Sequence, residues 1–284
     1  MNEIIFYMES HPLLTAVICS VVGYLTGSLS SARIVYFMAT GNRTIEPFAE
    51  PVPHSDETFE SDLVSATLVT KKLGAKYGCI TSLSDMAKVA VPTLLVKLAF
   101  GTEPFFLLVA LFGVIGHNLP VWYGFKGGRG ESPIIGVLLV INWFGLILAN
   151  AAAAILGYVT GSVLVVRWGG YLILIPWLWY YFSDWRYGLF MILLNFFFWL
   201  SMRKDLTRFI ELKSKRGLAF TEEEVSEFIL MGKSMGRFLD RYSLYAILKR
   251  VMGSKSADGS KGADGCKGAD GCKNHAGSKG KSDQ

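Results

Sequence analysis

The stretch IIGVLLVINWFGLILANAAAAILGYVTGSVLVV, from Ile134 to Val166, contains no Asp, Glu, Lys or Arg. Long uncharged blocks of this kind are typical of membrane-spanning helices. The whole chain shares this character, because 51% of its 284 residues are hydrophobic and only 18% are charged, with a mean hydropathy of +0.38. A soluble chain carries about 25% charged residues. The composition therefore excludes an ordinary soluble enzyme and predicts an all-α, polytopic membrane protein.

We divide this stretch into two apolar blocks, 134–148 and 150–166, and find others at about 13–38, 86–100, 104–116, 171–183 and 188–202. Together they predict about seven transmembrane helices, although several blocks are shorter than the roughly 20 residues of a perpendicular span, so five or six remain open. Lys and Arg gather in the loops 40–84 and 117–132, at Arg167 and in the tail, and 17 of the 28 follow Met202. Because cytoplasmic loops are enriched in these residues, we expect a multi-pass protein of the cell membrane with its N-terminus outside and its C-terminus inside.

The chain divides into three predicted regions. Residues 1–210 form the transmembrane domain. Residues 211–252 form a cytoplasmic amphipathic helical extension, in which Thr221 and Glu224 have capping-box spacing. We expect its helix to lie on the lipid interface or on the cytoplasmic face of the bundle. Residues 253–284 repeat a six-residue, low-complexity unit that cannot form a core, which predicts a disordered tail. The tail residues Cys266, Cys272 and His275 are poorly spaced for a metal, and the sequence predicts neither a metal site nor a cofactor.

The loop GHNLPVWYGFKGGRGES, from Gly116 to Ser132, is the most informative polar segment. Its glycines can turn backbone N–H groups toward one centre, and its Lys and Arg add positive charge, as an anion site requires. If a helix begins near Ser132, its N-terminal dipole points to the same place. The alternative is a flexible, positively charged loop with glycines for turning. The candidate residues here are His117, Lys126, Gly127, Gly128, Arg129 and Gly130.

Two further clusters lie at the ends of predicted spans. The segment from Gly23 to Arg33 is rich in small residues, among them Ser28 and Ser31. Helix packing explains such residues, but it explains poorly an arginine within a span. Asp85 and Lys88 are three residues apart and therefore share a helix face. The alternative for this pair is a helix cap beside a lysine that reaches the interface.

These stretches together resemble the integral-membrane acyl-phosphate:glycerol-3-phosphate acyltransferases of bacterial phospholipid synthesis. Gly23 to Ala32 matches the family's Gly-Tyr-Leu-x-Gly-Ser-Ile-Pro-Ser-Ala pattern. Asp85 and Lys88 match its Asp-x-x-Lys-Gly pair, with a valine for the glycine. Gly116 to Gly130 matches its Gly-His-x-x-Pro…Phe-Lys-Gly-Gly-Lys-Gly loop, with Arg129 for the last lysine. The resemblance covers residues 10 to about 210.

The resemblance implies a seven-span bundle that transfers a fatty acyl group from acyl phosphate to glycerol 3-phosphate or a related polyol phosphate. The products are lysophosphatidic acid and phosphate, in the first step of phospholipid synthesis. The implied partners are these substrates and the bilayer, with no nucleic acid and no obligate protein partner. The resemblance implies catalytic roles for Lys126, Arg129, Ser61 and Asp205. It implies substrate binding by Ser28, Ser31, Thr67, Lys71, Asp85, Lys88, His117, Gly127, Gly128, Gly130 and Arg208.

The sequence departs from the family pattern in two places. The family's Gly-Ser-Gly-Asn-x-Gly-Ala-Thr-Asn motif is reduced at residues 60–68, where Ser61, Ala66 and Thr67 survive and two acids are added. Near the last span, Met202 and Asp205 stand in place of a His-x-x-Asn pair, while Arg208 is retained. These changes leave two alternatives open: a shifted acyl acceptor, or a catalytically degenerate relative that acts as a membrane scaffold or regulator. A transporter is a further alternative, but we find no internal repeat of the kind that transporters carry.

Overall fold

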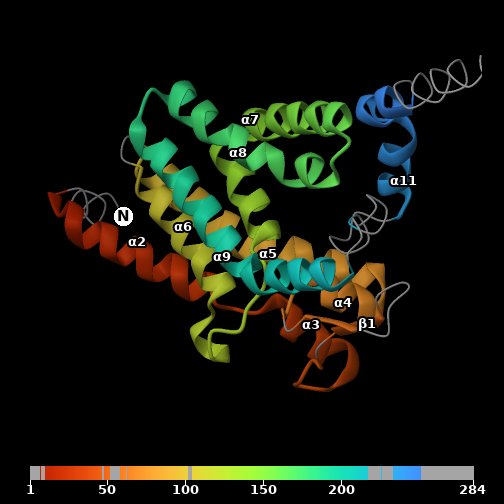
Figure 1. The fold of residues 1–284 in the computed structure, drawn as a ribbon. Coiled ribbons are helices and arrows are strands. Elements are labelled where there is room, and N and C mark those ends of the chain that lie inside the picture. The colour runs from red at the N-terminus through yellow and green to blue at the C-terminus, as the bar shows by residue number, and fades with distance from the viewer. Residues whose placement is uncertain are drawn as a thin grey trace, which may run out of the picture.

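A computed structural model describes residues 7, 10–46, 48–51, 58–61, 63–101, 104–216, 225 and 233–250. Within them the chain is almost entirely helical (Figure 1). The helices are α2 (Pro12–Gly27), α3 (Ser31–Thr40), α4 (Ala66–Leu73), α5 (Ala75–Ala99), α6 (Phe105–Asn118), the 3₁₀ turn η1 (Val121–Tyr123), α7 (Glu131–Thr160), α8 (Val163–Phe182), α9 (Trp185–Arg216) and α11 (Lys233–Tyr242).

Six segments in the described residues are long and apolar enough to cross a membrane. They are Pro12–Thr40, Ala75–Ala99, Phe105–Tyr123, Glu131–Thr160, Val163–Phe182 and Trp185–Arg203. The first comprises α2 and α3, which are separated by a short break at residues 28–30. The prediction of an all-α, polytopic membrane protein is therefore confirmed.

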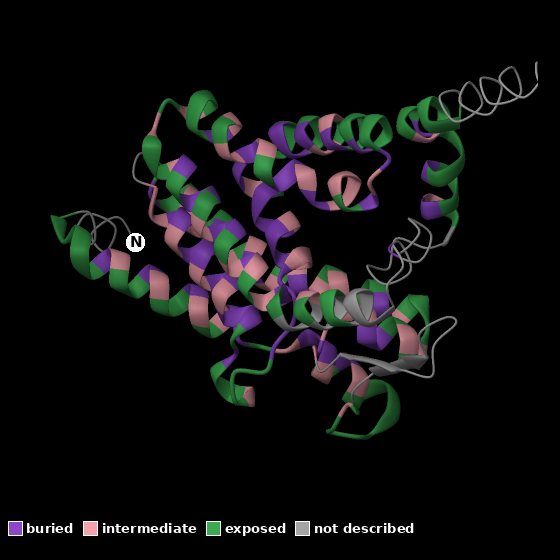
Figure 2. Ribbon diagram, viewed as in Figure 1, coloured by how far each residue is buried: buried purple, intermediate pink, exposed green. Residues whose placement is uncertain are grey.

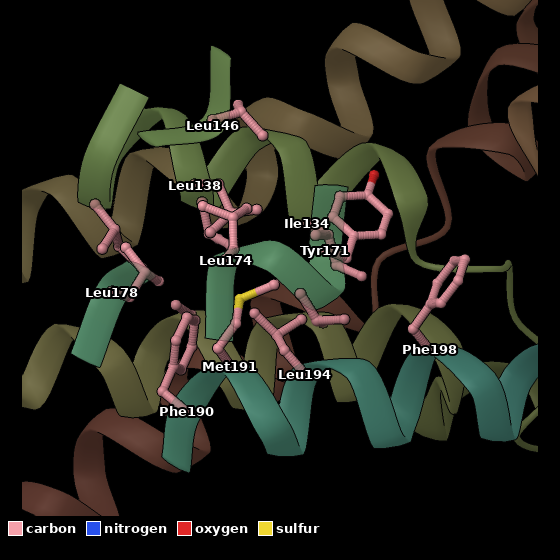
Figure 3. Close-up of a cluster of buried hydrophobic side chains, with 14 of the residues drawn as sticks. Ile134, Leu138, Leu146, Tyr171, Leu174, Leu178, Phe190, Met191, Leu194 and Phe198 are labelled. Atoms are coloured by element: carbon pink, nitrogen blue, oxygen red, sulfur yellow. The ribbon is translucent and has the colours of Figure 1, made fainter. Parts of the chain in front are cut away.

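Helix α7 is not straight, because Asn142 has non-helical backbone angles (φ −155°, ψ 83°). Its first half lies along α8 in the same direction. Glu131 is ion-paired with Arg167 near the start of α8, and Ile134 lies beside Tyr171 one turn further along (Figure 3). The two segments therefore ascend side by side from the same end of the bundle.

The second half of α7 lies along α8 in the opposite direction. Gly145 is packed against Trp177, whereas Gly157 is packed against Val166 at the other end of α8. At 1.5 Å per residue, residues 143–160 extend about 27 Å. The two halves of α7 thus run in opposite directions from the bend at Asn142, but residues 131–141 extend only about 16 Å. The described residues contain six candidate spans, which lies within the five to seven that the sequence left open.

The boundaries of two predicted spans were wrong. The chain reverses at Asn142 rather than near Asn150, and the predicted block 150–166 includes the turn at Gly161 and Ser162, after which α8 begins. An apolar run with no proline carries little signal for the bend at Asn142, whereas Gly161 and Ser162 are typical of a helix end. The predicted loop at 40–84 also contains structure. Helix α4 and the first ten residues of α5 lie in it, so Asp85 and Lys88 lie within α5 and not, as the sequence predicted, at the start of a span. In the same loop, β1 (Phe48–Pro51) pairs antiparallel with β2 (Thr58–Ser61), with Phe48 opposite Ser61.

The main core lies where α6, α7, α8 and α9 meet (Figures 2 and 3). Its side chains are large and apolar, and Leu138, Leu174 and Leu194 are completely buried. Large apolar residues also cover the outside of the bundle, for example Leu83 and Leu98 of α5. Such surfaces face lipid in a membrane protein, so their exposure is expected.

Lysine 97, near the end of α5, closes the bend in α7. Its ammonium donates a hydrogen bond to the carbonyl of Val140 at 2.7 Å and lies 3.4 Å from that of Ile141. It also lies 5.6 Å from the ring centre of Phe106. The bend frees carbonyls that a continuous helix would have bonded, and in a membrane such groups need an internal partner. Lys97 supplies it.

The C-terminal extension is described only in part. Helix α11 and a further helical segment at 244–250 lie within the predicted region 211–252. The predicted cap at Thr221 and Glu224 and the tail from residue 253 lie outside the described residues. Leu239 of α11 is buried and belongs to the main core.

Candidate active site

One cavity gathers residues from all three motifs that the sequence singled out. It lies at the end of the bundle where α2 gives way to α3, and where α6 leads into the loop 119–130 (Figure 1). The small-residue segment from Gly23 to Arg33 contributes Ser28, and α5 contributes Asp85 and Lys88. The candidate site residues that line it are Ser28, Asp85, Lys88, His117, Gly127 and Gly128. The three motifs therefore form one site.

Three ionisable side chains form the floor of this cavity. The Lys88 ammonium lies 2.8 Å from Asp85 Oδ1 and 3.0 Å from His117 Nδ1. It also donates to the carbonyl of Leu29 at 2.5 Å. Asp85 and His117 are themselves 3.4 Å apart. All three side chains are buried, with exposed fractions of 10% for Lys88, 3% for Asp85 and 7% for His117.

The Nδ1 atom of His117 lies 3.0 Å from the Lys88 ammonium and 3.4 Å from Asp85 Oδ1, and the shorter contact favours one tautomer. An ammonium group has three N–H donors and no acceptor, so Nδ1 is the acceptor in the contact with Lys88. In the neutral imidazole the proton then lies on Nε2. The Cα of Gly128 packs directly over this atom, and a Cβ at that position would clash with Nε2. His117 thus presents an N–H donor toward the glycine loop.

Three contacts hold the glycine loop in place. The Val64 N–H donates to the Gly127 carbonyl at 3.2 Å, which joins the segment before α4 to the loop. The guanidinium of Arg33 lies 4.7 Å from the ring centre of Tyr123 and donates to the Lys126 carbonyl at 3.4 Å. Sequence reasoning noted Arg33 as costly within a span but assigned it no role. The structure places it against the loop.

The expectation that the loop amides converge on an anion is only partly met. The amides of Phe125, Lys126 and Gly128 donate to carbonyls of residues 117–123 and are therefore used inside the protein. Helix α7 begins at Glu131, one residue before the predicted start, with Gly130 as its N-cap. Helix geometry leaves the first amides of α7 without intrahelical acceptors. The amide donors for an anion are therefore those at the start of α7.

The two loop cations lie in different environments. Arg129 is buried, and its carbonyl lies 3.5 Å from the Ser201 hydroxyl of α9. Gly130 adjoins the side-chain amide of Asn118, which donates to the Phe197 carbonyl of α9 at 3.3 Å. Lys126, in contrast, is exposed. Helix α9 thus packs against the loop beside Arg129, whereas Lys126 lies at the surface.

The remaining predicted residues lie around the cavity or outside the described side chains. Ser31 is buried at the start of α3, between Ser30 and Ala32, which line the cavity. Thr67 and Lys71 are half-buried on α4, directly after Val64. Ser61 lies in β2, and Asp205 and Arg208 lie in α9, but the structure describes only the backbone at these three positions.

The site is cationic and hydrogen-bonding in character. Among the described residues, no group of three His, Cys, Asp or Glu side chains could hold a metal ion. The one acid at the start of α7, Glu131, accepts two hydrogen bonds from Arg167 at 3.0 and 2.6 Å, so its charge is balanced. Such hydrogen-bonding groups, with the cations Arg33 and Arg129 nearby, suit an anionic ligand.

A bundle of apolar helices with a buried polar site at one end defines an integral membrane protein. The family model for glycerol-3-phosphate acyltransferase matches residues 17–212, and the chain belongs to this family. The matched range contains every site residue considered above.

Individual relatives agree with the family model. A glycerol-3-phosphate acyltransferase of Francisella tularensis (strain FSC 198) is 32% identical over 128 residues, which are 45% of this chain and 57% of that protein. One of Lactiplantibacillus plantarum is 26% identical over 195 residues, which are 68% of this chain and 87% of that protein. The chain thus spans little more than half of the Francisella relative.

Solved structures support the same fold. Crystal structures of PlsY (YgiH), an integral membrane glycerol 3-phosphate acyltransferase, match with a TM-score of 0.54 at 21% identity in the lysophosphatidic acid form and 22% in the glycerol 3-phosphate form. Each match covers 69% of this chain and 92% of the PlsY chain.

Proposed function

We propose that this protein is an acyltransferase that moves a fatty acyl group from acyl phosphate to glycerol 3-phosphate or a related polyol phosphate. The observation that carries the proposal is the single cavity in which Ser28, Lys88, His117 and the glycine loop meet. Membership of the family and the names of its relatives support the choice of substrates. The products are lysophosphatidic acid and phosphate.

The reaction suits a site that only positions its reactants. The acceptor hydroxyl attacks the carbonyl carbon of the acyl phosphate, a new C–O ester bond forms, and the carbonyl C–O bond to phosphate breaks. The released phosphate carries away the hydroxyl proton, so the protein needs no dedicated base. Alignment of the two reactants and stabilisation of developing negative charge are then the main sources of rate enhancement.

The residues divide between these tasks. We assign the phosphate of the donor to Arg129, the start of α7 and the Nε2–H of His117. The Gly128 backbone packs over Nε2 and leaves no room for a side chain there. Thr67 and Lys71 lie on α4, which follows Val64 in the chain. We assign these two residues to the acceptor. We assign the exposed Lys126 to the solvent-facing edge of the site, where its charge attracts anionic substrates from water.

The experiment is a turnover assay with purified protein, palmitoyl phosphate and glycerol 3-phosphate, which follows both phosphate and lysophosphatidic acid. Arg129→Ala should lose activity by about 10²-fold or more, as expected for removal of a group that stabilises transition-state charge. Arg186→Ala is the matched control, because Arg186 pairs with Asp184 in the turn between α8 and α9, away from the cavity. Equal turnover by both variants would refute the role of Arg129.

The acceptor is tested in the same assay. Activity with another polyol phosphate, and none with glycerol 3-phosphate, would mean that the altered segment at 60–68 has changed acceptor specificity. Failure to release phosphate with any acceptor, from protein that still unfolds cooperatively, would favour the degenerate scaffold instead.

We also propose that the cavity faces the cytoplasm of a cell in whose plasma membrane the protein resides. The basic loops 40–84 and 117–132 adjoin the cavity, which supports this orientation. Exposed Cys79 lies near the start of α5, beside the site, whereas Cys19 is buried. In a variant with Cys266→Ser and Cys272→Ser, a membrane-impermeant maleimide should label Cys79 only after intact cells are permeabilised. Labelling of intact cells would reverse the orientation.

A further inference from the structure

The last described helices extend beyond the residues that the family model matches, which end at residue 212. Helix α11 crosses the end of the paired α7 and α8 helices instead of continuing along them (Figure 1). After Ser243 the chain continues as a short helix over residues 244–250. This pair of helices is a separate feature of the chain, and the acyl-transfer site does not use it.

One face of α11 is anchored to the turn between α7 and α8. Leu239 and Ser243 are 2% and 1% exposed. The Ser243 hydroxyl lies so close to Gly161 that a Cβ on the glycine would be 2.9 Å from it. The same hydroxyl accepts a hydrogen bond from the Ala246 N–H at 3.2 Å, and it therefore also caps the following helix. The position of the helices relative to the spans is thus defined by packing.

Next to the anchored face, large apolar side chains stay about half exposed, although the Phe238 ring lies 6.5 Å from that of Tyr158 and Tyr245 packs beside Gly161. Phe238, Tyr242 and Tyr245 are 49%, 50% and 58% exposed, and Leu244, Ile247 and Leu248 are exposed to a similar degree (Figure 2). Because the anchor is the turn between two membrane-spanning segments, this face lies at the level where a span leaves the bilayer. Aromatic and aliphatic side chains are stable at that depth.

The same segment is strongly basic. Between residues 233 and 250 there are five Lys or Arg residues and a single acid, Asp240. Arg241, Lys249 and Arg250 are exposed beside the apolar side chains. Exposed apolar residues together with cations are the pattern of a helix that lies on an anionic bilayer surface, where lipid phosphates attract the cations.

We infer that residues 233–250 form a membrane-surface module that binds the anionic lipid headgroups of the leaflet on the same side as the α7–α8 turn. Ser243 and the start of the Tyr245 side chain hold the module against Gly161. The exposed parts of Phe238, Tyr242 and their aliphatic neighbours insert among the lipids. The exposed cations then lie at the level of the headgroup phosphates. The partner is thus the lipid surface itself, and its binding does not depend on acyl transfer.

The test uses the full chain reconstituted as single copies in nanodiscs. Amide hydrogen exchange over 233–250 is measured in discs of phosphatidylcholine alone and in discs with 30 mol% phosphatidylglycerol. About tenfold slower exchange is expected in the anionic discs, because each basic residue near such a surface adds to the attraction. High salt should reduce the difference, since surface charges are screened. Free glycerol phosphate in solution should have no effect.

The variant Arg241→Glu, Lys249→Glu, Arg250→Glu should lose the difference between the two discs while the exchange of 143–170 is unchanged. A control that reverses two exposed lysines elsewhere, Lys72→Glu with Lys76→Glu, should retain it, since these residues lie in α4 and at the start of α5. Equal protection of residues 233–250 from exchange in both kinds of disc would overturn the inference. Burial of apolar side chains alone would then explain the protection. Protection that appears only when cell extract is added would also overturn it, in favour of a protein partner.

Discussion

Helix α5 carries two lysines, Lys88 and Lys97, whose surroundings differ in kind. Lys88 contacts a carboxylate, an imidazole nitrogen and one backbone carbonyl. Lys97 contacts two backbone carbonyls and the face of Phe106. Both satisfy the rule that a charge within a span needs polar partners. The partners of Lys88 are titratable side chains that open on a cavity, whereas those of Lys97 are the carbonyls left by the bend in α7.

The difference shows that an ionisable residue in a span is not by itself evidence of function. The identity of the partners decides between a site and a structural cap. Lys88 fixes the orientation of His117, whose second nitrogen packs against the Gly128 backbone beside the cavity. Lys97 replaces helical hydrogen bonds at Val140 and Ile141. Substitutions on α5 and at His117 can test that distinction, and the largest effect is expected at Lys88.

The first prediction concerns the charge pair at Lys88. Lys88→Met leaves Asp85 buried without its cation, and breaking one partner of a buried pair costs about 3–5 kcal/mol. The double variant Asp85→Asn, Lys88→Met removes both charges and should recover most of the free energy of unfolding, which is measured by denaturation in detergent. It should not recover turnover, because Nδ1 of His117 has lost its donor. Recovery of full activity would show that the pair only stabilises the fold.

The second prediction separates the two nitrogens of His117. The amide nitrogen of a glutamine can occupy the position of Nε2, whereas an asparagine side chain reaches only Nδ1. His117→Asn should therefore reduce kcat by about 10²-fold, as for other lost donors to a transition-state charge. His117→Gln should lose markedly less. If the two variants were equally impaired, the donor function of Nε2 would be disproved, and the histidine would be a packing residue.

The third prediction concerns Lys97. Lys97→Met removes the donor to Val140 and should lower the free energy of unfolding by about 1–3 kcal/mol, the cost of a buried group left unsatisfied. The kcat of the folded fraction should stay within about twofold of the parent, because Lys97 lies nine residues beyond Lys88, about 13 Å further along α5. Lys97→Gln keeps one donor and should be less destabilised. A large loss of kcat with unchanged stability would contradict the distinction from Lys88.

The sequence predicted the membrane fold and the contents of the site because both depend on local signals. Uncharged blocks predicted the spans, and the three-residue spacing of Asp85 and Lys88 predicted their shared face. The resemblance then joined them to His117 and Gly128. What the sequence did not predict depends on contacts between distant segments. The pairing of Val64 with Gly127 is one example, since backbone groups carry no sequence signature.

Lys97 and the bend at Asn142 form a second example. A single non-helical residue reverses α7 in a run of apolar residues that contains neither a proline nor a cluster of turn residues. The sequence analysis did not single out Lys97. The signal that could have found it is a charge near the end of a span, which needs polar partners, but no rule assigns those partners to α7. Asp205 and Arg208 stay predictions, since the structure describes only their backbone.

The smallest predicted effect is that of a neutral contact on the same helix. The hydroxyls of Ser82 on α5 and Ser132 in the first turn of α7 are 2.9 Å apart. Hydrogen bonds between membrane helices average about 0.6 kcal/mol, because each group finds other partners when the contact is lost. A double-mutant cycle with Ser82→Ala and Ser132→Ala should give a coupling energy of that size. A coupling energy of several kcal/mol would mean that this neutral pair stabilises the contact between α5 and α7 as much as the lysines stabilise theirs. The contrast between charged and neutral contacts along α5 would then be wrong.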